Sequence, residues 1–248
     1  MTGRVALVTG AGSGIGRALL EGLLARQHDG TIYASASSDV SLATLHALAA
    51  SDERIRPVRL DVTDETSLRN AAASLQPAGR LDLVINTVGI LHDVDHRPEK
   101  RLADVGSAWL ERSFAVNATG ALLLARVMEP LLRASPRALF ASLSARVGSI
   151  ADNRSGGWYA YRASKAAHNM FIRTLAIEWR RYQPPISCVA LHPGTVDTGL
   201  SAPFLGGRPP NAVFSPATAA GHLLAVLDGL TPEQSGGFFA WDGSPVLW

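Results

Sequence analysis

Short apolar runs alternate with longer amphipathic segments along the whole of this 248-residue chain. Such alternation is typical of parallel strands joined by crossover helices. It predicts one doubly wound α/β domain over 1–248, with a seven-stranded parallel sheet in the order 3-2-1-4-5-6-7 and helices on both faces. The expected strands are 5–9, 31–35, 56–60, 81–86, 138–143, 186–191 and 237–241. The expected helices, identified from apolar residues at three- and four-residue spacing, are 14–26, 40–50, 65–74, 101–133, 158–182 and 216–230.

A glycine cluster, Thr-Gly-Ala-Gly-Ser-Gly-Ile-Gly at 9–16, follows the first apolar run and opens the first amphipathic segment. A glycine loop in this context can hold a pyrophosphate at a helix N-terminus. The pattern Gly-x-Gly-x-x-Gly fails, because Ile15 or Arg17 falls where its last glycine should be. The pattern Thr-Gly-x-x-x-Gly-x-Gly fits without a mismatch. A tight turn that binds no ligand is the alternative.

Tyr161 and Lys165 are four residues apart within an expected helix. Residues at this spacing share a helix face, so the ammonium can lie beside the phenol and lower its pKa from the usual value of about 10. The pair is therefore a candidate proton donor that works near neutral pH. A surface pair without function is the alternative reading of the same spacing.

These two motifs resemble those of the short-chain dehydrogenase/reductase family, and further matches follow in the expected order. Asp61-Val62 resembles the pair that contacts the adenine, 86–89 resembles the family's Asn-Asn-Ala-Gly with two differences, and 193–198 resembles the segment that turns toward the nicotinamide. The resemblance implies a Rossmann fold that binds a dinucleotide. The candidate coenzyme contacts are Gly10, Ser13, Gly14, Ile15, Gly16, Ser35, Ser37, Asp61, Val62, Asn86, Gly89, Tyr161, Lys165, Pro193, Gly194, Val196 and Thr198.

The resemblance also implies a catalytic set of Tyr161, Lys165, Asn117 and a serine. In the family, the asparagine helps to hold a local helix distortion and a water that relays protons, and the lysine also binds the nicotinamide ribose. Hydride transfer to a carbonyl develops negative charge on the oxygen, so an acid and a second hydrogen-bond donor lower the barrier.

The serine is where the sequence departs from the family pattern. Family members read Ser-Ser-x-x-Gly after the fifth strand, and Ala145 stands here in place of the second serine. Ser144 is one residue earlier than the family's second serine. On a regular strand, a shift of one residue points the side chain to the opposite face, but a bulge at a strand end can turn it back. We therefore predict Ser144 as the carbonyl-polarising residue, with Ser149 as the next candidate.

The end of the second expected strand indicates the coenzyme. An acidic residue there would bind the ribose hydroxyl of NAD and repel a 2′-phosphate, and no carboxylate occurs before Asp39. NADP(H) is favoured, with NAD(H) as the alternative. Ser13 and Ser37 stand where the family often has a basic residue.

Two segments, 152–157 and 236–243, resemble the sniffer-type carbonyl reductases and the bacterial C-factor group of the family. This resemblance implies NADPH-linked hydride transfer between the coenzyme and a ketone, an aldehyde or a secondary alcohol. The alternatives are a nucleotide-binding signalling or scaffold protein without turnover and, among enzymes, a 3-oxoacyl-thioester reductase. The Gly/Pro-rich stretch 203–216 is expected to be a long loop, and such loops are often functional. We therefore expect a substrate loop near 199–215.

Composition limits the partners. The 23 basic and 21 acidic residues are interspersed and leave a formal charge of +2, so neither nucleic acid nor a membrane is expected as a partner.

Cys188 is the one cysteine and lies in an apolar run, so we expect a buried thiol. His92 and His96 lie in an expected loop without a third ligand, and no metal site is predicted. We expect a cytoplasmic protein, and the family resemblance implies a homodimer or homotetramer.

Overall fold

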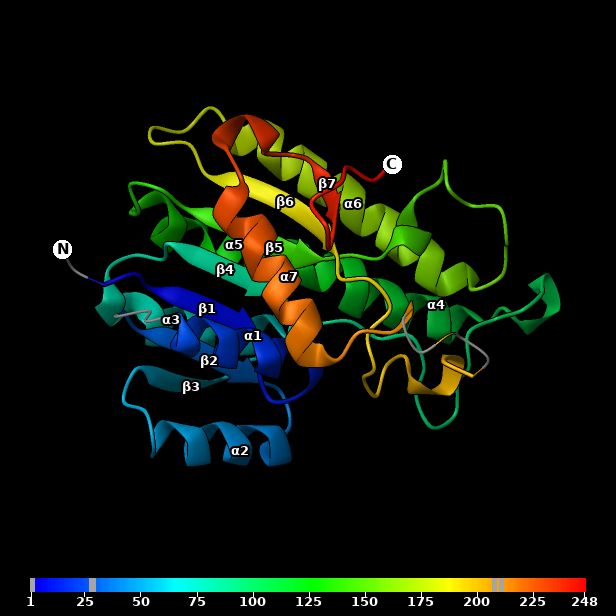
Figure 1. The fold of residues 1–248 in the computed structure, drawn as a ribbon, viewed down its shortest axis with the longest axis horizontal. Coiled ribbons are helices and arrows are strands. Elements are labelled where there is room, and N and C mark those ends of the chain that lie inside the picture. Colours follow the sequence, from blue (N-terminus) through cyan, green and yellow to red (C-terminus); the bar gives the residue numbers. More distant parts are fainter. Residues whose placement is uncertain (1–2, 27–29, 207–208, 210–211) are drawn as a thin grey trace.

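The computed structural model describes residues 3–26, 30–206, 209 and 212–248. Over these residues, seven parallel strands form one sheet in the order β3-β2-β1-β4-β5-β6-β7, with helices on both faces (Figure 1). The predicted fold class and strand order are confirmed. The strands are β1 Ala6–Thr9, β2 Ile32–Ala36, β3 Ile55–Arg59, β4 Leu83–Asn86, β5 Leu139–Leu143, β6 Ser187–His192 and β7 Phe238–Ala240.

The helices divide between the two faces according to their apolar residues. The helices are α1 Gly14–Ala25, α2 Asp39–Ala49, α3 Glu65–Leu75, α4 Ser107–Phe114, α5 Gly120–Arg133, α6 Tyr159–Trp179 and α7 Pro216–Gly229. One hydrophobic cluster joins α1, α2 and α7 to the sheet, and a second joins α3, α5 and α6 to the opposite face. The central strands β1, β4 and β5 are buried along their whole length, as expected for parallel strands covered on both sides.

The predicted helix at 101–133 is wrong as a single element. The structure instead has a 3₁₀ turn at Leu102–Asp104, then α4, a π turn at Ala115–Thr119, and α5. The physical reason lies in long-range hydrogen bonds: the side chain of Asn117 in the π turn bonds to Ile90, in the loop after β4. A continuous apolar pattern cannot reveal this local rewinding, because it is caused by a residue distant in the sequence.

Among the described residues, one helical segment, Ser107–Arg133, has the length and hydropathy of a membrane span. Just over half of its most apolar window, 56 %, is buried inside the fold. Leu124, Ala125 and Met128 of this segment pack in the cluster that joins α5 to the sheet. Its apolarity is accounted for by packing in the core.

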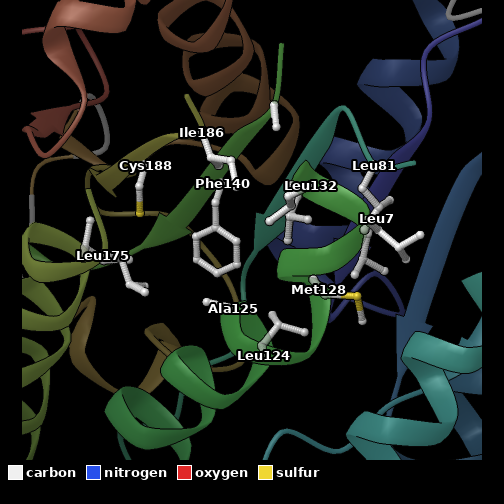
Figure 2. Packing of buried hydrophobic residues seen from close by; sticks show 14 of the residues in the cluster. Leu7, Leu81, Leu124, Ala125, Met128, Leu132, Phe140, Leu175, Ile186 and Cys188 are labelled. Atoms are coloured by element: carbon white, nitrogen blue, oxygen red, sulfur yellow. The ribbon is translucent and has the colours of Figure 1, made fainter. Parts of the chain in front are cut away.

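Phe140 of β5 is a central contact of that cluster. Its side chain is fully buried, and its ring meets the Trp179 ring of α6 edge-on with 5.8 Å between centroids. Figure 2 shows the Phe140 ring pointing from the sheet toward Leu124 and Ala125 of α5. Phe140 therefore links the sheet to two helices.

Replacing Phe140 with Ala leaves a cavity between the sheet, α5 and α6, and should lower the free energy of unfolding by about 3–5 kcal/mol. Urea unfolding followed by circular dichroism measures the change. Val40→Ala is the matched control, because Val40 is an apolar residue of α2 but 80 % exposed. A loss below about 1 kcal/mol for Phe140→Ala would contradict the central role of this contact.

Candidate active site

A cleft of about 540 Å³ opens at the carboxyl ends of the strands. It lies where β1 and β4 are neighbours and the strand order reverses, which is where doubly wound sheets bind their ligands. The glycine loop and the tyrosine–lysine pair both line it. The predicted site residues that line the cleft are Gly10, Ser13, Gly14, Ile15, Gly16, Ser37, Asp61, Val62, Gly89, Ser144, Tyr161, Lys165, Pro193 and Thr198.

The glycine loop has the shape of a dinucleotide cradle. A Cβ at Gly16 would lie 2.3 Å from the main-chain oxygen of Gly10, so a side chain would displace the loop. Gly14 has a φ of +52°, and a Cβ there would meet Thr198 at 3.4 Å. Ser13, the N-cap of α1, makes no side-chain capping hydrogen bond. The first N–H groups of α1 lie at the cleft without partners within the helix, and this arrangement fits a pyrophosphate.

Ser35 and Asn86 do not line the cleft, although both were predicted to contact the coenzyme. Asn86 connects three strands: its Oδ1 accepts from Oγ1 of Thr9 at 2.7 Å, and its Nδ2 donates to Oγ of Ser142 at 2.9 Å. The Ser35 hydroxyl is buried and has no hydrogen-bond partner among the described residues. Both side chains lie behind the cleft wall, and Asn86 fixes the strand ends that form it.

Gly194 and Val196 also lie behind the cleft lining. Gly194 has a φ of +82°, and a Cβ there would lie 2.7 Å from the ring of Phe214 and 3.1 Å from that of Trp241. Val196 is buried and pairs with Phe214 in an isolated bridge. These residues shape the turn that presents Pro193 and Thr198 to the cleft.

Tyr161 and Lys165 lie side by side on α6, but their electrostatics differ from the expectation. The Nζ of Lys165 is 6.0 Å from the centroid of the Tyr161 ring and donates to the main-chain oxygen of Leu143 at 2.9 Å. Burial raises the pKa of the Tyr161 phenol above its usual value and lowers the pKa of Lys165 to about 8. The prediction of a lowered phenol pKa is therefore wrong for this arrangement, because the phenol is buried.

Ser144 lines the cleft, yet its hydroxyl is already engaged. It donates to Oδ1 of Asn169 on α6 at 2.6 Å. Ser149, the second candidate, accepts from the main-chain N–H of Asp152 and does not line the cleft. Of the two serines, only Ser144 reaches the cleft that holds Tyr161.

Asn117 lies in the π turn between α4 and α5, directly behind the cleft. Its Oδ1 accepts from the N–H of Ile90 at 2.7 Å, and its Nδ2 donates to the oxygen of Ile90 at 2.9 Å and to Oγ of Ser164 at 3.0 Å. The helix distortion that the family resemblance implies at this asparagine is present. Asn117 thereby joins the loop after β4 to the helix that carries Tyr161.

Sequence reasoning missed several residues that support this site. Glu99 is buried, and its carboxylate accepts from the N–H of Ala160 at the start of α6. His168 and Asn169 follow Lys165 by three and four residues, a spacing that already indicated a shared helix face. Glu99 had no such local signal, because it lies 61 residues from its partner.

Aromatic rings lie beside Tyr161. Trp158 begins α6 with a φ of +51°, unusual for a residue other than glycine, and its ring meets Tyr161 at 6.2 Å and Phe204 at 5.2 Å between centroids. Phe204 belongs to the 3₁₀ turn Ala202–Phe204 in the predicted substrate loop. Part of that loop, 207–208 and 210–211, lies outside the described residues. The described part brings apolar surface next to the tyrosine.

The two histidines weighed as metal ligands have other partners. His96 pairs with Asp93 and stacks on Trp109, and His92 contacts the oxygen of Gly199. Within the part of the chain that the structure describes, no group of three or more His, Cys, Asp or Glu side chains could hold a metal ion.

A doubly wound sheet whose glycine loop and tyrosine–lysine pair share one cleft defines a dinucleotide-dependent oxidoreductase. The chain belongs to the short-chain dehydrogenase/reductase family, since residues 4–206 match the family described as short chain dehydrogenase. It is 38 % identical to the C-signal of Myxococcus xanthus over 170 residues, 68 % of this chain and 94 % of the relative. It is 33 % identical to a 1-hydroxy-2-glutathionyl-2-methyl-3-butene dehydrogenase of a Rhodococcus species over 98 % of both chains.

Solved structures agree with this assignment. An NADPH-bound carbonyl reductase from chicken fatty liver covers both chains fully with a TM-score of 0.88 and 29 % identity. The carbonyl reductase Sniffer of Drosophila melanogaster covers both chains fully with a TM-score of 0.87 and 26 % identity. The predicted likeness to the sniffer and C-factor group is confirmed, and the chain is an enzyme of the short-chain dehydrogenase/reductase family.

The pKa of Lys165 makes stability depend on pH in a defined window. Its folded-state pKa of about 8 lies below its usual 10.5, so the unfolded chain binds more protons between these values and stability rises with pH there. Lys165→Met removes the buried charge. The wild type gains stability as pH rises from 8 to 10.5, and the variant does not. The free energy of unfolding of Lys165→Met, relative to that of the wild type, should therefore fall by up to about 3 kcal/mol over this range.

Urea unfolding at a series of pH values measures this difference. Lys100→Met, which removes an exposed lysine, is the control and should show no such trend. A difference between Lys165→Met and wild type that stays constant from pH 7 to about 10.5 would mean that the ammonium carries no burial penalty.

Proposed function

We propose that the chain catalyses reversible hydride transfer between NADP(H) and a ketone, an aldehyde or a secondary alcohol, with Tyr161 as the general acid and base. The observation that carries this proposal is the meeting of Tyr161, Lys165 and the glycine loop in one cleft at the carboxyl ends of the strands. The NADPH-bound carbonyl reductase from chicken supports the same chemistry by its likeness over the full chain.

A nicotinamide coenzyme held at the glycine loop, Gly10 to Gly16, would supply or accept the hydride. The Tyr161 hydroxyl donates its proton to the carbonyl oxygen as negative charge grows there, and the nearby Lys165 ammonium stabilises the phenolate that results. Ser144 adds a second donor when its hydroxyl turns from Asn169 toward the cleft, since a hydroxyl hydrogen rotates freely between acceptors. Asn117 keeps the π turn, and with it the wall behind Lys165, in place.

The aromatic surface beside Tyr161 favours carbonyl compounds with apolar or aromatic substituents. Trp158 and Phe204 supply the rings, and Leu200 lines the cleft. Apolar pockets with a few convergent polar groups are typical of small-molecule sites. The substrate would lie between this surface and the glycine-loop side of the cleft, next to Gly199 and Leu200 at the start of the loop near 199–215.

Arg59 provides the basic group that the β2 end lacks. Its guanidinium donates to the main-chain oxygen of Ser37 at 3.0 Å and pairs with the carboxylate of Asp39. Ser37 lines the cleft. This ion pair offsets part of the charge of Asp39, the first acidic residue after β2, and leaves an arginine beside Ser37 of the cleft. This arrangement supports NADP(H) over NAD(H).

A nucleotide-binding protein without turnover is the second candidate. It is favoured by the alanine at 145 and by the bond between Ser144 and Asn169, which leave the cleft without a serine hydroxyl free to donate to a carbonyl beside Tyr161. Coenzyme binding without consumption across a panel of carbonyl compounds would support it. A 3-oxoacyl thioester in the same panel tests the remaining enzymatic alternative.

We also propose a homodimer or homotetramer. Met170 and Ile177 are exposed apolar residues of α6, a helix that commonly packs between subunits in the family. Size-exclusion chromatography with light scattering measures the mass. The cytoplasmic location expected from the sequence stays a prediction.

Replacing Tyr161 with Phe should lower kcat for NADPH-linked carbonyl reduction by at least about a hundredfold, because the proton donor is lost while the ring remains. NADPH binding, followed by fluorescence titration, should change little. Tyr159→Phe is the matched control, since Tyr159 is also on α6 but 40 % exposed. Turnover of every accepted carbonyl within about tenfold of wild type would refute the assignment.

Replacing Arg59 with Ala should raise the KM for NADPH by about tenfold or more and leave the KM for NADH within about twofold, because only NADPH carries the phosphate that a charged hydrogen bond would stabilise. Steady-state kinetics with both coenzymes measure the effect. Arg56→Ala, on the same strand and exposed, is the control. Equal changes for both coenzymes would exclude a phosphate contact at Arg59.

A further inference from the structure

His168 is buried in the catalytic region, yet the proposed reaction gives it no role. It is three residues after Lys165 and seven after Tyr161 on α6, so the three share one face of the helix. Its side chain is 1 % exposed. Its Nδ1 lies 3.0 Å from the main-chain oxygen of Asn117, and its Nε2 is buried with no hydrogen-bond partner in the described parts of the chain.

The contact with Asn117 fixes the protonation of the ring. A carbonyl oxygen only accepts, so Nδ1 carries the hydrogen and donates it. Burial, and then the charge of Lys165, lower the pKa of His168 to about 3. The ring is therefore neutral at working pH, with a hydrogen on Nδ1 and a bare Nε2.

This hydrogen bond completes a clamp on the π turn. Ile90 and Ser164 hold the side chain of Asn117, and His168 holds its main chain. The wider winding of a π turn is less favourable than a regular helix and persists where other contacts maintain it. Contacts to both the side chain and the main chain of one residue supply that support.

The unpartnered Nε2 indicates that His168 does more than fill space in the core. A buried nitrogen without a partner destabilises the folded chain, and an apolar side chain of similar volume would avoid this cost. A residue present only to fill space would gain nothing from the imidazole. The Nδ1 donor is what the imidazole adds.

We propose that His168 is a positioning residue of the reductase reaction. The His168 side chain donates a hydrogen bond from Nδ1 to the main-chain oxygen of Asn117, and this bond holds the π turn in place behind Lys165 and Tyr161. The inference rests on the proposed function. It concerns the rate of the chemical step, because His168 does not line the cleft.

Three substitutions at position 168 test the proposal. His168→Leu fills the space without a donor, His168→Asn places an amide N–H near the position of Nδ1, and His168→Gln places one near the position of Nε2. For His168→Leu we expect kcat for carbonyl reduction to fall by about tenfold to a hundredfold, as small misplacements of catalytic groups do. The KM for NADPH should stay within about threefold, and the melting temperature should change little, because the lost bond to Asn117 and the removal of the unpartnered nitrogen have opposite effects on stability.

The pattern of rescue gives the decisive comparison. His168→Asn should recover kcat to within about threefold of wild type, whereas His168→Gln should remain impaired, because only the former restores the donor at Nδ1. Thr174→Ser, an exposed position on the same helix, is the control. If His168→Leu does not fold, the comparison of the Asn and Gln variants decides the matter alone.

Wild-type kcat in His168→Leu, or equal impairment of the Asn and Gln variants, would overturn the proposal. A wild-type protein that reduces no carbonyl would instead refute the proposed function. Nuclear magnetic resonance of ¹⁵N-histidine-labelled protein reads the tautomer without any turnover. A hydrogen on Nδ1 of His168 at neutral pH is the expected result, and a hydrogen on Nε2 would overturn the inference.

Discussion

The hydrogen bond from the buried ammonium of Lys165 to the main-chain oxygen of Leu143 is the constraint on which the rest of the site depends. It joins the middle of α6 to the carboxyl end of β5. The turn after β5 also packs closely against α6, since a Cβ added at Gly148 would lie 2.8 Å from the Cβ of Lys165. With α6 fixed in this way, Tyr161 one turn earlier lies in the cleft beside the glycine loop.

The π turn also holds α6. Asn117 bonds to Ser164 through its side chain and to His168 through its main chain, so the helix is held at positions that flank Lys165 on both sides. Gly89 completes the packing: a Cβ there would lie 3.3 Å from Oδ1 of Asn117 and 3.5 Å from Nζ of Lys165. Strand ends, π turn and helix thus position the tyrosine–lysine pair together.

The sequence predicts what is local or periodic. Strand order and layers follow from the alternation of apolar runs, and the cleft follows from two short motifs whose spacing is read directly. The family resemblance implies the helix distortion at Asn117, but the apolar pattern alone does not reveal it, because Asn117 is held by Ile90 and His168, 27 and 51 residues away. The pKa of Tyr161 was predicted with the wrong sign, because helical spacing reveals the nearby ammonium but not the burial of the phenol, which raises its pKa.

Hydride transfer in this cleft is tested most directly by following the hydride itself. The reaction is run with NADPH deuterated at carbon four of the nicotinamide, on the face from which the enzyme transfers, and an apolar ketone, and the alcohol is analysed by mass spectrometry. A single deuterium is expected on the carbinol carbon of the product. If neither face of the deuterated coenzyme labels the alcohol from any ketone or aldehyde in the panel, the claim that this cleft transfers hydride is contradicted.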